Sequence, residues 1–305
     1  MHQPVLLEPT IAFLFTDPGG TYVDCTLGGG GHLQRLLDRL SPRARVIAID
    51  QDREILEQTR EKLNDNRVTY VCANFRRLEE ILFSQGVDQV NGILLDLGVS
   101  SFQLDTPERG FSFHQDAELD MRMDRENALT AQEMVNNYSE AQIADILFRF
   151  GEERYARRIA SAIVEARREN EITTTMQLVE IIKEAVPAAY RREKHPARKT
   201  FQALRIAVNG EMESLQEVLP QAVNALGRDG RLCVISFHSL EDREVKRFLQ
   251  QEARGCICPP QMPVCTCGHT PRLRLLNRKP VKADEHECER NPRARSARLR
   301  AAERI

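Results

Sequence analysis

The sequence lacks any run approaching the roughly 18 consecutive apolar residues that a membrane-spanning helix needs. Its N-terminus has no basic segment followed by a long apolar stretch, so a secretory signal is not expected either. Internal repeats and low-complexity tracts are also absent, which excludes a repeat architecture. These absences predict a cytoplasmic protein that makes no contact with a membrane.

The chain is nevertheless too long for one ordinary hydrophobic core. Its 305 residues predict either two units or one unit with a large insertion. The hydrophobic share of 41% is sufficient for globular folding. The net charge of −2 conceals local clusters of Lys and Arg, so local patches are more informative than the overall balance.

Apolar runs rich in β-branched residues alternate with helix-period segments in the first third of the chain. The helical segments begin near Gly, Asp or Asn, which suit a helix N-terminus. Near-continuous apolar strands separated by helices predict an α/β fold with a parallel sheet covered on both faces. The predicted strands span residues 22–27, 46–50, 68–72, 92–97 and 231–237, and the first predicted helices span 32–40, 52–63 and 75–84.

The strand and helix alternation stops after about residue 104. From Thr130 to Val186 apolar residues recur only at three- and four-residue spacings, which indicates helices alone. We therefore predict an inserted all-helical domain at residues 108–196. The sheet domain would comprise residues 1–107 and 197–305, with a helix near 201–226 before the last strand and a basic C-terminal tail.

A glycine-rich loop follows the first predicted strand. This loop consists of Gly28–Gly31 followed by His32, and Asp50 ends the next predicted strand about 20 residues further along the chain. Glycines let backbone N–H groups approach a ligand closely, and a carboxylate at this spacing can accept both ribose hydroxyl protons. The pattern predicts a site for an adenosine-bearing cofactor. The alternative is a tight strand-to-helix turn without a ligand.

The residue at position 33 helps to choose the cofactor. A dinucleotide fingerprint read from Gly28 would need a glycine there, and the sequence has Leu33. The loop therefore favours a nucleoside without pyrophosphate, which means S-adenosylmethionine over NAD or FAD.

A third strand end adds a carboxylate to the same region. Asp96 closes the fourth predicted strand, and the carboxyl ends of parallel strands share one edge of a sheet. We expect the methyl-accepting atom of a substrate to lie near this position. Asp96 could alternatively cap a helix or organise a loop.

Several long segments carry a family resemblance that covers almost the whole chain. The sequence resembles the bacterial small-subunit ribosomal RNA methyltransferase H family, also called MraW. The segments that carry the resemblance are HQPVLL at 2–7, LLDLGVSS at 94–101, QLD at 103–105, RGFSF at 109–113, LDMRM at 119–123, GEERYARRI at 151–159, HPARKTFQALR at 195–205, VISFHSLEDR at 234–243 and NPRARS at 291–296.

The resemblance implies a Rossmann-like S-adenosylmethionine-dependent methyltransferase sheet interrupted by a helical domain that recognises the RNA. It also implies transfer of a methyl group to N4 of a cytidine in the decoding centre, at the P site, of 16S ribosomal RNA within the small ribosomal subunit. Whether the protein forms a homodimer is left open. The cofactor-binding residues that the resemblance implies are Gly30, Gly31 and His32 for the methionine part, Asp50 for the ribose, Phe75 for adenine, and Asp96 with Gln103 near the reactive methyl.

The amine of cytosine shares its lone pair with the ring, so positive charge develops on nitrogen as the methyl is transferred. A carboxylate or carbonyl oxygen near its N–H protons stabilises that charge, and we expect Asp96 or the backbone oxygens of residues 97–98 to do so. Asp120 is the second candidate, with a structural pairing to Arg122 or Arg109 as the alternative. His238 and Ser239 could contact the base, or His238 could be a satisfied strand-end histidine.

Basic clusters are the candidate RNA contacts, with a merely solvated surface as the alternative. A cytidine must be extruded or single-stranded to be methylated, and its phosphates then need basic partners. Steep salt dependence of binding would accompany such contacts. The first cluster is Arg191, Arg192, Lys194, Arg198 and Lys199, and the second is Arg293 and Arg295, followed by Arg298 and Arg300.

The cysteines fall into two groups. Three of the eight, at positions 25, 72 and 233, lie in predicted strands as small hydrophobic residues. Four others form two C-x-C pairs near His269, namely Cys256, Cys258, Cys265 and Cys267. They could hold a structural zinc ion, although C-x-x-C pairs are more usual, or form a reduced, flexible loop.

Two other function classes remain open from the residues alone. A nicotinamide-dependent oxidoreductase would share the βαβ start, but Leu33 argues against it. An RNA-binding ribosome-assembly protein without catalysis would need the basic clusters and would not need Gly30, Asp50 and Asp96 at one sheet edge.

Overall fold

The computed structural model describes residues 4–193, 195–256, 258, 262 and 264–305. The chain divides into two compact units. The sheet unit contains the residues up to Gly98 together with Glu213–Ile305, and the helical unit is Val99–Met212. Lys194, one of the candidate RNA contacts, lies outside the described residues.

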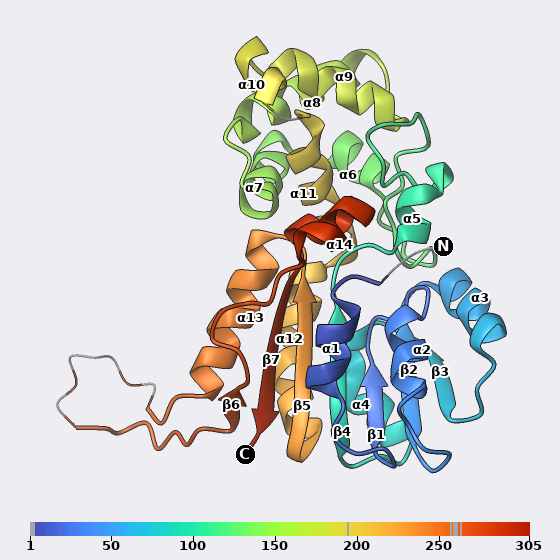
Figure 1. The fold of residues 1–305 in the computed structure, drawn as a ribbon. Helices are drawn as coiled ribbons and strands as arrows, with labels where there is room; N and C mark the ends of the chain where they lie inside the picture. Colours follow the sequence, from blue (N-terminus) through green and yellow to red (C-terminus); the bar gives the residue numbers. More distant parts are fainter. Residues whose placement is uncertain (1–3, 194, 257, 259–261, 263) are drawn as a thin grey trace. The chain divides into compact units, whose positions relative to one another are not determined.

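The sheet unit is built on seven strands in the order β3-β2-β1-β4-β5-β7-β6 (Figure 1). The first five are parallel to one another, whereas β7 runs antiparallel to both β5 and β6. This mixed, mostly parallel sheet confirms the predicted α/β fold class. The strands are β1 Thr21–Asp24, β2 Arg45–Asp50, β3 Val68–Cys72, β4 Val90–Asp96, β5 Leu226–Ser236, β6 Leu273–Leu275 and β7 Arg298–Arg304.

The strand order reverses between β1 and β4. From β1 the chain builds outward to β2 and β3, and it then returns to place β4 on the other side of β1. Ligands of open α/β sheets bind outside the carboxyl ends of the strands at such a point. The order therefore predicts a ligand site beside the ends of β1 and β4.

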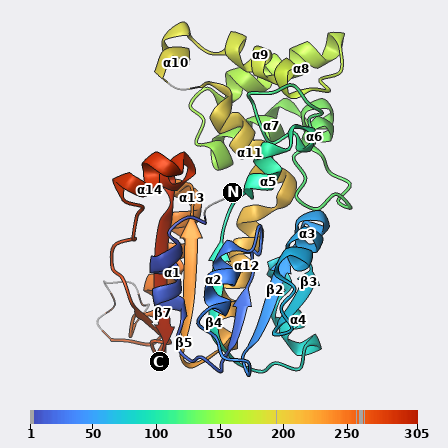
Figure 2. The ribbon, with the colours of Figure 1, turned by 45° about the vertical axis from the view of Figure 1, so that its right-hand side comes forward.

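Helices cover both faces of the sheet (Figures 1 and 2). On one face α1 (Leu7–Leu14) and α2 (Gly31–Leu37) bury apolar residues against alternate positions of the strands. On the other face α4 (Leu78–Ser84) and α12 (Glu211–Ala225) lie side by side, with Asn224 donating to Glu79 at 3.0 Å. The remaining helices of this unit are α3 Arg53–Leu63, the 3-10 turn η1 Phe75–Arg77, α13 Ser239–Glu252, α14 Glu285–Arg290 and the 3-10 turn η3 Pro292–Ser296.

The helical unit has its own apolar core. The helix pairs α7–α11, α7–α8 and α8–α9 pack against each other around fully buried side chains such as Ile143, Leu147 and Ile163. Its elements are α5 Ser101–Asp105, the 3-10 turn η2 Pro107–Arg109, α6 Ala131–Asn137, α7 Glu140–Gly151, α8 Ala156–Glu169, α9 Thr175–Ala185, α10 Ala188–Glu193 and α11 Ala197–Asn209.

The boundaries expected at residues 108 and 196 both lie inside the helical unit. Val99 and Leu104 pack against its core, and α11 contributes buried Phe201 and Leu204 to the same core. The segment expected as one helix near 201–226 is two helices, because Gly210 adopts a left-handed conformation (φ 57°) that ends α11. Within the described residues, no helix is both long and apolar enough to cross a membrane.

Candidate functional site

Three aspartates occupy the carboxyl ends of neighbouring parallel strands. Asp24 ends β1, Asp50 ends β2 and Asp96 ends β4. Since β1 lies between β2 and β4, the three carboxyl groups share one edge of the sheet, at the point where strand order reverses. The structure thus brings Asp50 and Asp96 to the common edge that the sequence predicted, and it adds Asp24.

The Asp50 carboxylate holds the glycine loop in place. Its Oδ2 accepts the backbone N–H of Gly28 at 2.9 Å, and its Oδ1 accepts that of Asp52 at 2.9 Å. Burial raises the pKa of Asp50 to about 6. Each carboxylate oxygen can accept more than one hydrogen bond, so both retain capacity for hydroxyl donors.

Packing explains why the loop needs glycine. Gly30 has φ 72°, and a Cβ there would lie 2.6 Å from Cγ2 of Thr59 in α3. A Cβ on Gly31 would lie 2.6 Å from Cγ of Pro4. Gly29, in contrast, has open space around it. Gly30 and Gly31 therefore allow the turn to lie close to neighbouring segments of the sheet unit.

Asp24 is a site residue that the sequence analysis missed. Its side chain is 3% exposed and accepts the backbone N–H of Thr26 at 3.1 Å. Burial, with repulsion from Asp50 as a smaller cause, raises its pKa to about 7. The available signal was its position as an acidic residue at a strand end, which it shares with Asp50 and Asp96.

Asp96 has the most perturbed environment of the three. Its backbone N–H donates to Oγ1 of Thr26 at 2.6 Å, and its Oδ2 lies 3.5 Å from Nδ1 of His32. Its Oδ1 is buried and has no hydrogen-bond partner among the residues that the structure describes. Burial raises the pKa of Asp96 well above its usual value, and the nearby carboxyl groups of Asp24 and Glu241 raise it further. Such a group can accept a hydrogen bond from a bound molecule.

His32 and Phe75 also belong to the sheet unit. His32 lies in the first turn of α2 and is 5% exposed, and its Nε2 lies 3.0 Å from the carbonyl oxygen of Val5. Phe75 is half-buried in the turn η1 after β3. Arg76 anchors this turn through two contacts of 2.8 and 2.6 Å with Glu217 of α12. Their cofactor-binding roles stay predictions.

Gln103 and Asp120 belong to the helical unit. The side chain of Gln103 is 4% exposed and completes the capping box of α5, with its Oε1 accepting the backbone N–H of Ser100 at 3.0 Å. Both carboxylate oxygens of Asp120 accept from the Arg122 guanidinium, at 2.7 and 2.9 Å. Burial alone would raise the pKa of Asp120, but the bonds from Arg122 outweigh it and lower the pKa. This pairing favours the structural role for Asp120.

His238 caps α13. Its Nδ1 accepts the backbone N–H of Glu241 at 3.4 Å, and its Nε2 lies 3.1 Å from Oε1 of the same residue. Nδ1 therefore has a partner, whereas the buried Nε2 makes no hydrogen bond within the described residues, so a base contact by His238 stays a prediction.

The candidate RNA contacts differ in their surroundings. Arg191, Arg192 and Arg198 are exposed in the helical unit, and Arg295 is exposed in the sheet unit. Lys199 donates to the carbonyl oxygen of Glu152 at 2.7 Å, and Arg293 is half-buried.

Arg298 and Arg300, which follow the second basic cluster, have a partner inside the sheet unit. Both lie in β7 and pair with Asp242 of α13, at 2.8 and 2.7 Å, and Arg300 is only 7% exposed. Two cations converge on one buried carboxylate, so these arginines link β7 to α13 within the sheet unit.

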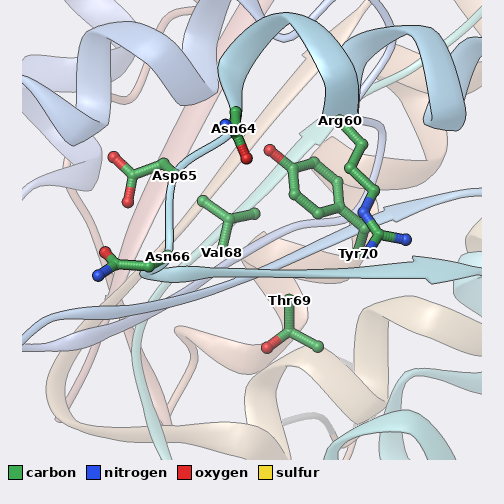
Figure 3. Close-up of a pocket in the computed structure, with 7 residues that line it drawn as sticks. All are labelled: Arg60, Asn64, Asp65, Asn66, Val68, Thr69 and Tyr70. Atoms are coloured by element: carbon green, nitrogen blue, oxygen red, sulfur yellow. The ribbon is translucent and has the colours of Figure 1, made fainter.

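The sheet unit also has a hollow of about 420 Å³, whose lining residues are drawn in Figure 3. It is lined by the end of α3 and the start of β3, including Arg60, Asn64 and Tyr70. Since Val68 begins β3 and Cys72 ends it, the hollow lies toward the opposite end of the strand from the aspartates. It is therefore separate from the candidate site.

The relatives that are similar in sequence agree with the resemblance read from the motifs. Ribosomal RNA small subunit methyltransferase H of Clostridium botulinum is 48% identical over 305 residues, covering 100% of this chain and 99% of that protein. The protein of the same name from Heliobacterium modesticaldum is 51% identical over 308 residues, covering 100% and 98%. Among solved structures, an rRNA methylase from Streptococcus thermophilus aligns with a TM-score of 0.43 at 10% identity, covering 100% of this chain and 99% of that one.

The family comparison covers every residue of the chain. The MraW methylase family matches residues 1–305, which includes both units and the candidate site. The family resemblance stated from the sequence motifs is therefore confirmed, and with it the prediction of a methyl-transferring enzyme. This chain belongs to the MraW methylase family.

Proposed function

We propose that this chain transfers a methyl group from S-adenosylmethionine to N4 of a cytidine in the decoding centre, at the P site, of 16S ribosomal RNA. The names of the relatives support ribosomal RNA of the small subunit as the substrate class. The observation that carries the chemistry is the buried Oδ1 of Asp96 at the end of β4, for which the described part of the chain offers no hydrogen-bond partner.

The acidic edge of the sheet fits this cofactor. Asp24 and Asp96 repel each other, and burial holds the pKa of both above the usual range. A cation bound beside them relieves that repulsion, and S-adenosylmethionine carries a sulfonium and an ammonium group. A pyrophosphate would add negative charge to the same edge, so the edge disfavours a dinucleotide.

Different residues of the sheet unit are proposed to bind different parts of S-adenosylmethionine. When bound, S-adenosylmethionine supplies an electrophilic methyl group, so the protein has to orient, desolvate and stabilise charge. Asp50 accepts the ribose hydroxyls, and Phe75 offers a ring for adenine. Gly30, Gly31 and His32 hold the methionine part. Gln103 of the helical unit is proposed to complete the site near the reactive methyl.

Asp96 is the residue proposed to act on the nucleophile. Its Oδ1 accepts a hydrogen bond from the N4 amine, which stabilises the positive charge that develops on nitrogen. Because burial favours its protonated form, the carboxylate is also suited to take up the proton that the amine loses. The backbone oxygens of residues 97–98 remain the alternative acceptors.

Basic residues are proposed to hold the RNA. Arg191, Arg192 and Arg198 are exposed in one unit, and Arg295 is exposed in the other. Cationic side chains that contact phosphates release counterions, which makes binding sensitive to salt. The base would be reached in a single-stranded or extruded state.

The test is methyl transfer from radiolabelled S-adenosylmethionine to small ribosomal subunits that lack the modification. Nucleoside analysis should give N4-methylated cytidine, and naked 16S RNA in a parallel reaction identifies the preferred form of the substrate. Label on any other nucleoside, or only on protein, would overturn the proposal. Calorimetry with S-adenosylmethionine and NAD in parallel tests the cofactor separately.

The family match favours methyl transfer over the two alternative functions. A nicotinamide-dependent oxidoreductase would bind NAD in the calorimetric comparison. A ribosome-assembly protein without catalysis would bind small subunits but leave their nucleosides unlabelled.

A further inference from the structure

A cysteine-rich segment leaves the sheet unit between α13 and β6 and returns to it. Its two ends are held together at Arg272, which donates its backbone N–H to the carbonyl oxygen of Glu252 at 2.8 Å and its Nε–H to that residue's carboxylate at 2.6 Å. The segment 254–271, here called the cysteine excursion, therefore begins and ends at a fixed base, and only its described residues are considered below.

The described residues of the cysteine excursion form no hydrophobic core. None of its described residues is buried, and its large apolar side chains Met262 and Val264 are 44% and 69% exposed. Fixing one residue's backbone costs about 1–2 kcal/mol of conformational entropy, and burial of apolar surface does not offset that cost here. Segments of this kind usually depend on disulfides or a metal ion for their structure.

The four sulfur atoms of the cysteine excursion nevertheless converge. The Sγ atom of Cys256 lies 3.4 Å from that of Cys265 and 3.8 Å from that of Cys267, and the last two are 3.6 Å apart. Cys258 joins them, because one ligand atom from each of the four cysteines lies within 4.8 Å of all the others. No disulfide joins any of the eight cysteines, all of which lie in the described part of the chain.

These separations match a tetrahedral metal site. Zinc–sulfur bonds of about 2.3 Å place the sulfur atoms at the corners of a tetrahedron with edges of about 3.8 Å. The three separations of 3.4, 3.6 and 3.8 Å lie close to that edge length. Sulfur atoms in an S–S bond are instead about 2.05 Å apart.

Backbone groups reinforce the arrangement. The backbone N–H of His269 donates to Sγ of Cys267 at 3.5 Å, and the backbone N–H of Thr266 is directed at Sγ of Cys258. Donors directed at sulfur stabilise the thiolate charge that metal binding requires. The imidazole of His269 is turned to the carbonyl oxygen of Gln251 at 3.2 Å. The group of converging ligand atoms comprises the four sulfurs and does not include His269.

We propose that Cys256, Cys258, Cys265 and Cys267 bind one zinc ion that fixes the fold of the cysteine excursion. All four positions of the tetrahedron belong to the protein, so no position is open for water or substrate, as in structural zinc sites. The two C-x-C pairs each supply two ligands, and Cys265 lies nine positions after Cys256 in the sequence. The ion therefore cross-links the two C-x-C pairs.

The first test measures metal in the full-length protein, grown in zinc-containing medium and purified without chelator and with any affinity tag removed. Plasma mass spectrometry should give about one zinc ion per chain. The double variant Cys256→Ser/Cys265→Ser removes one ligand from each pair and should retain less than about a tenth of that zinc. Cys288→Ser is the matched control, because Cys288 lies outside the cluster, and it should keep the full amount.

The second test uses the wild-type protein and so does not depend on the folding of a variant. A mercurial reagent that blocks thiols should release the zinc to a chromogenic chelator. Tryptic cleavage after the exposed Arg254 should then become at least about tenfold faster, because the segment opens locally. Removal of the mercurial with excess free thiol, followed by addition of cobalt, should restore protection and give the visible bands of tetrahedral thiolate coordination.

Three results would overturn the proposal. Iron at one ion per chain would assign the sulfurs to a different metal. Two disulfides in protein isolated without oxygen would replace metal binding by covalent pairing. Freely reactive thiols with no bound metal would show that the cysteine excursion is a reduced loop without a metal ion. None of these measurements involves methyl transfer, so their outcome is independent of the proposed function.

Discussion

The Nδ1 atom of His32 lies 3.5 Å from Oδ2 of Asp96, while Nε2 of the same ring lies 3.0 Å from the carbonyl oxygen of Val5. A carbonyl oxygen only accepts, so this contact assigns a proton to Nε2. One further proton can therefore sit between Nδ1 and Asp96. The carboxyl group is either ionised beside a charged imidazole or protonated beside a neutral one.

This shared proton suggests Asp96→Asn as a sharp test of the proposed chemistry. The amide can still donate to Nδ1 of His32, but it can neither carry the negative charge nor accept a proton from the amine. We expect kcat for methyl transfer to fall about 10²- to 10³-fold while the Kd of S-adenosylmethionine changes much less. Single-turnover transfer and calorimetry measure the two quantities.

The matched control is Asp88→Asn, an exposed aspartate just before the other end of β4, which should leave both quantities unchanged. Asp96→Ala with near-wild-type transfer and unchanged cofactor binding would remove Asp96 from the mechanism. The backbone oxygens of residues 97–98 would then be the remaining acceptors.

Asp24 should make the stability of the cofactor-free protein depend on pH. Its pKa is raised from 3.8 to about 7 in the folded state, mainly by burial, so the folded state retains a proton that the unfolded state loses. The resulting stabilisation is fully present below about pH 4 and is lost as pH rises through about 7. Asp24→Asn cannot ionise and should not show this loss.

The measurement is urea unfolding of the wild type and of Asp24→Asn at several pH values from about 5 to about 8. We expect the free energy of unfolding of the variant to rise relative to that of the wild type across this range. A constant difference between the two proteins would show that Asp24 ionises in the folded state as it does in water.

Steric contact at Gly30 predicts a second stability effect. In Gly30→Ala the new methyl group meets Cγ2 of Thr59 at 2.6 Å, and the residue must also hold φ 72°. We expect a loss of about 2–4 kcal/mol in the free energy of unfolding, from the contact and the left-handed backbone together. Gly29→Ala, which has open space around it, should cost much less.

A double-mutant cycle separates the two causes. Thr59→Ser removes the methyl group and keeps the hydroxyl that donates to the carbonyl oxygen of Gly28 at 2.7 Å. Gly30→Ala/Thr59→Ser should therefore recover the part of the steric cost that comes from Thr59. It should retain the backbone part and the contact of the new Cβ with Cδ1 of Leu63 at 2.8 Å. No recovery in chemical denaturation would mean that Thr59 is not what restricts position 30.

The sequence predicts which strands carry the site better than it predicts which side chains of the site are buried. Hydrophobic periodicity located the strands that carry Asp50 and Asp96, because burial on both faces of a parallel sheet leaves a clear apolar run. The same periodicity could not show that Asp24, at the end of the neighbouring strand β1, is buried as well, with only 3% of the residue exposed. An acidic residue inside an apolar run looks the same whether its side chain is buried or faces solvent.

Long-range pairing is the other feature that sequence reasoning missed. Arg300 looks like one more cation in a basic tail, yet its partner Asp242 is 58 positions away and meets it only after β7 has joined the sheet. The boundary at residue 196 failed to include α11 for a similar reason. Its Phe201 and Leu204 have a helical period that fits either unit, and only packing assigns them to the helical core.

Salt dependence should distinguish RNA contacts from an ordinary charged surface. Arg191 and Arg192 are exposed on α10. If both contact phosphates, Arg191→Ala/Arg192→Ala should weaken RNA binding and reduce the slope of log K against log salt by about 1.4, at about 0.7 per single-strand contact. Filter binding to a labelled fragment of 16S RNA at several salt concentrations measures the slope.

Arg168→Ala is the control, because Arg168 is exposed in the same unit and pairs with Glu165 at 2.7 Å. An equal slope for wild type, double variant and control would show that the arginines of α10 are a solvated surface, and the phosphate contacts would have to be sought at Arg198 or Arg295.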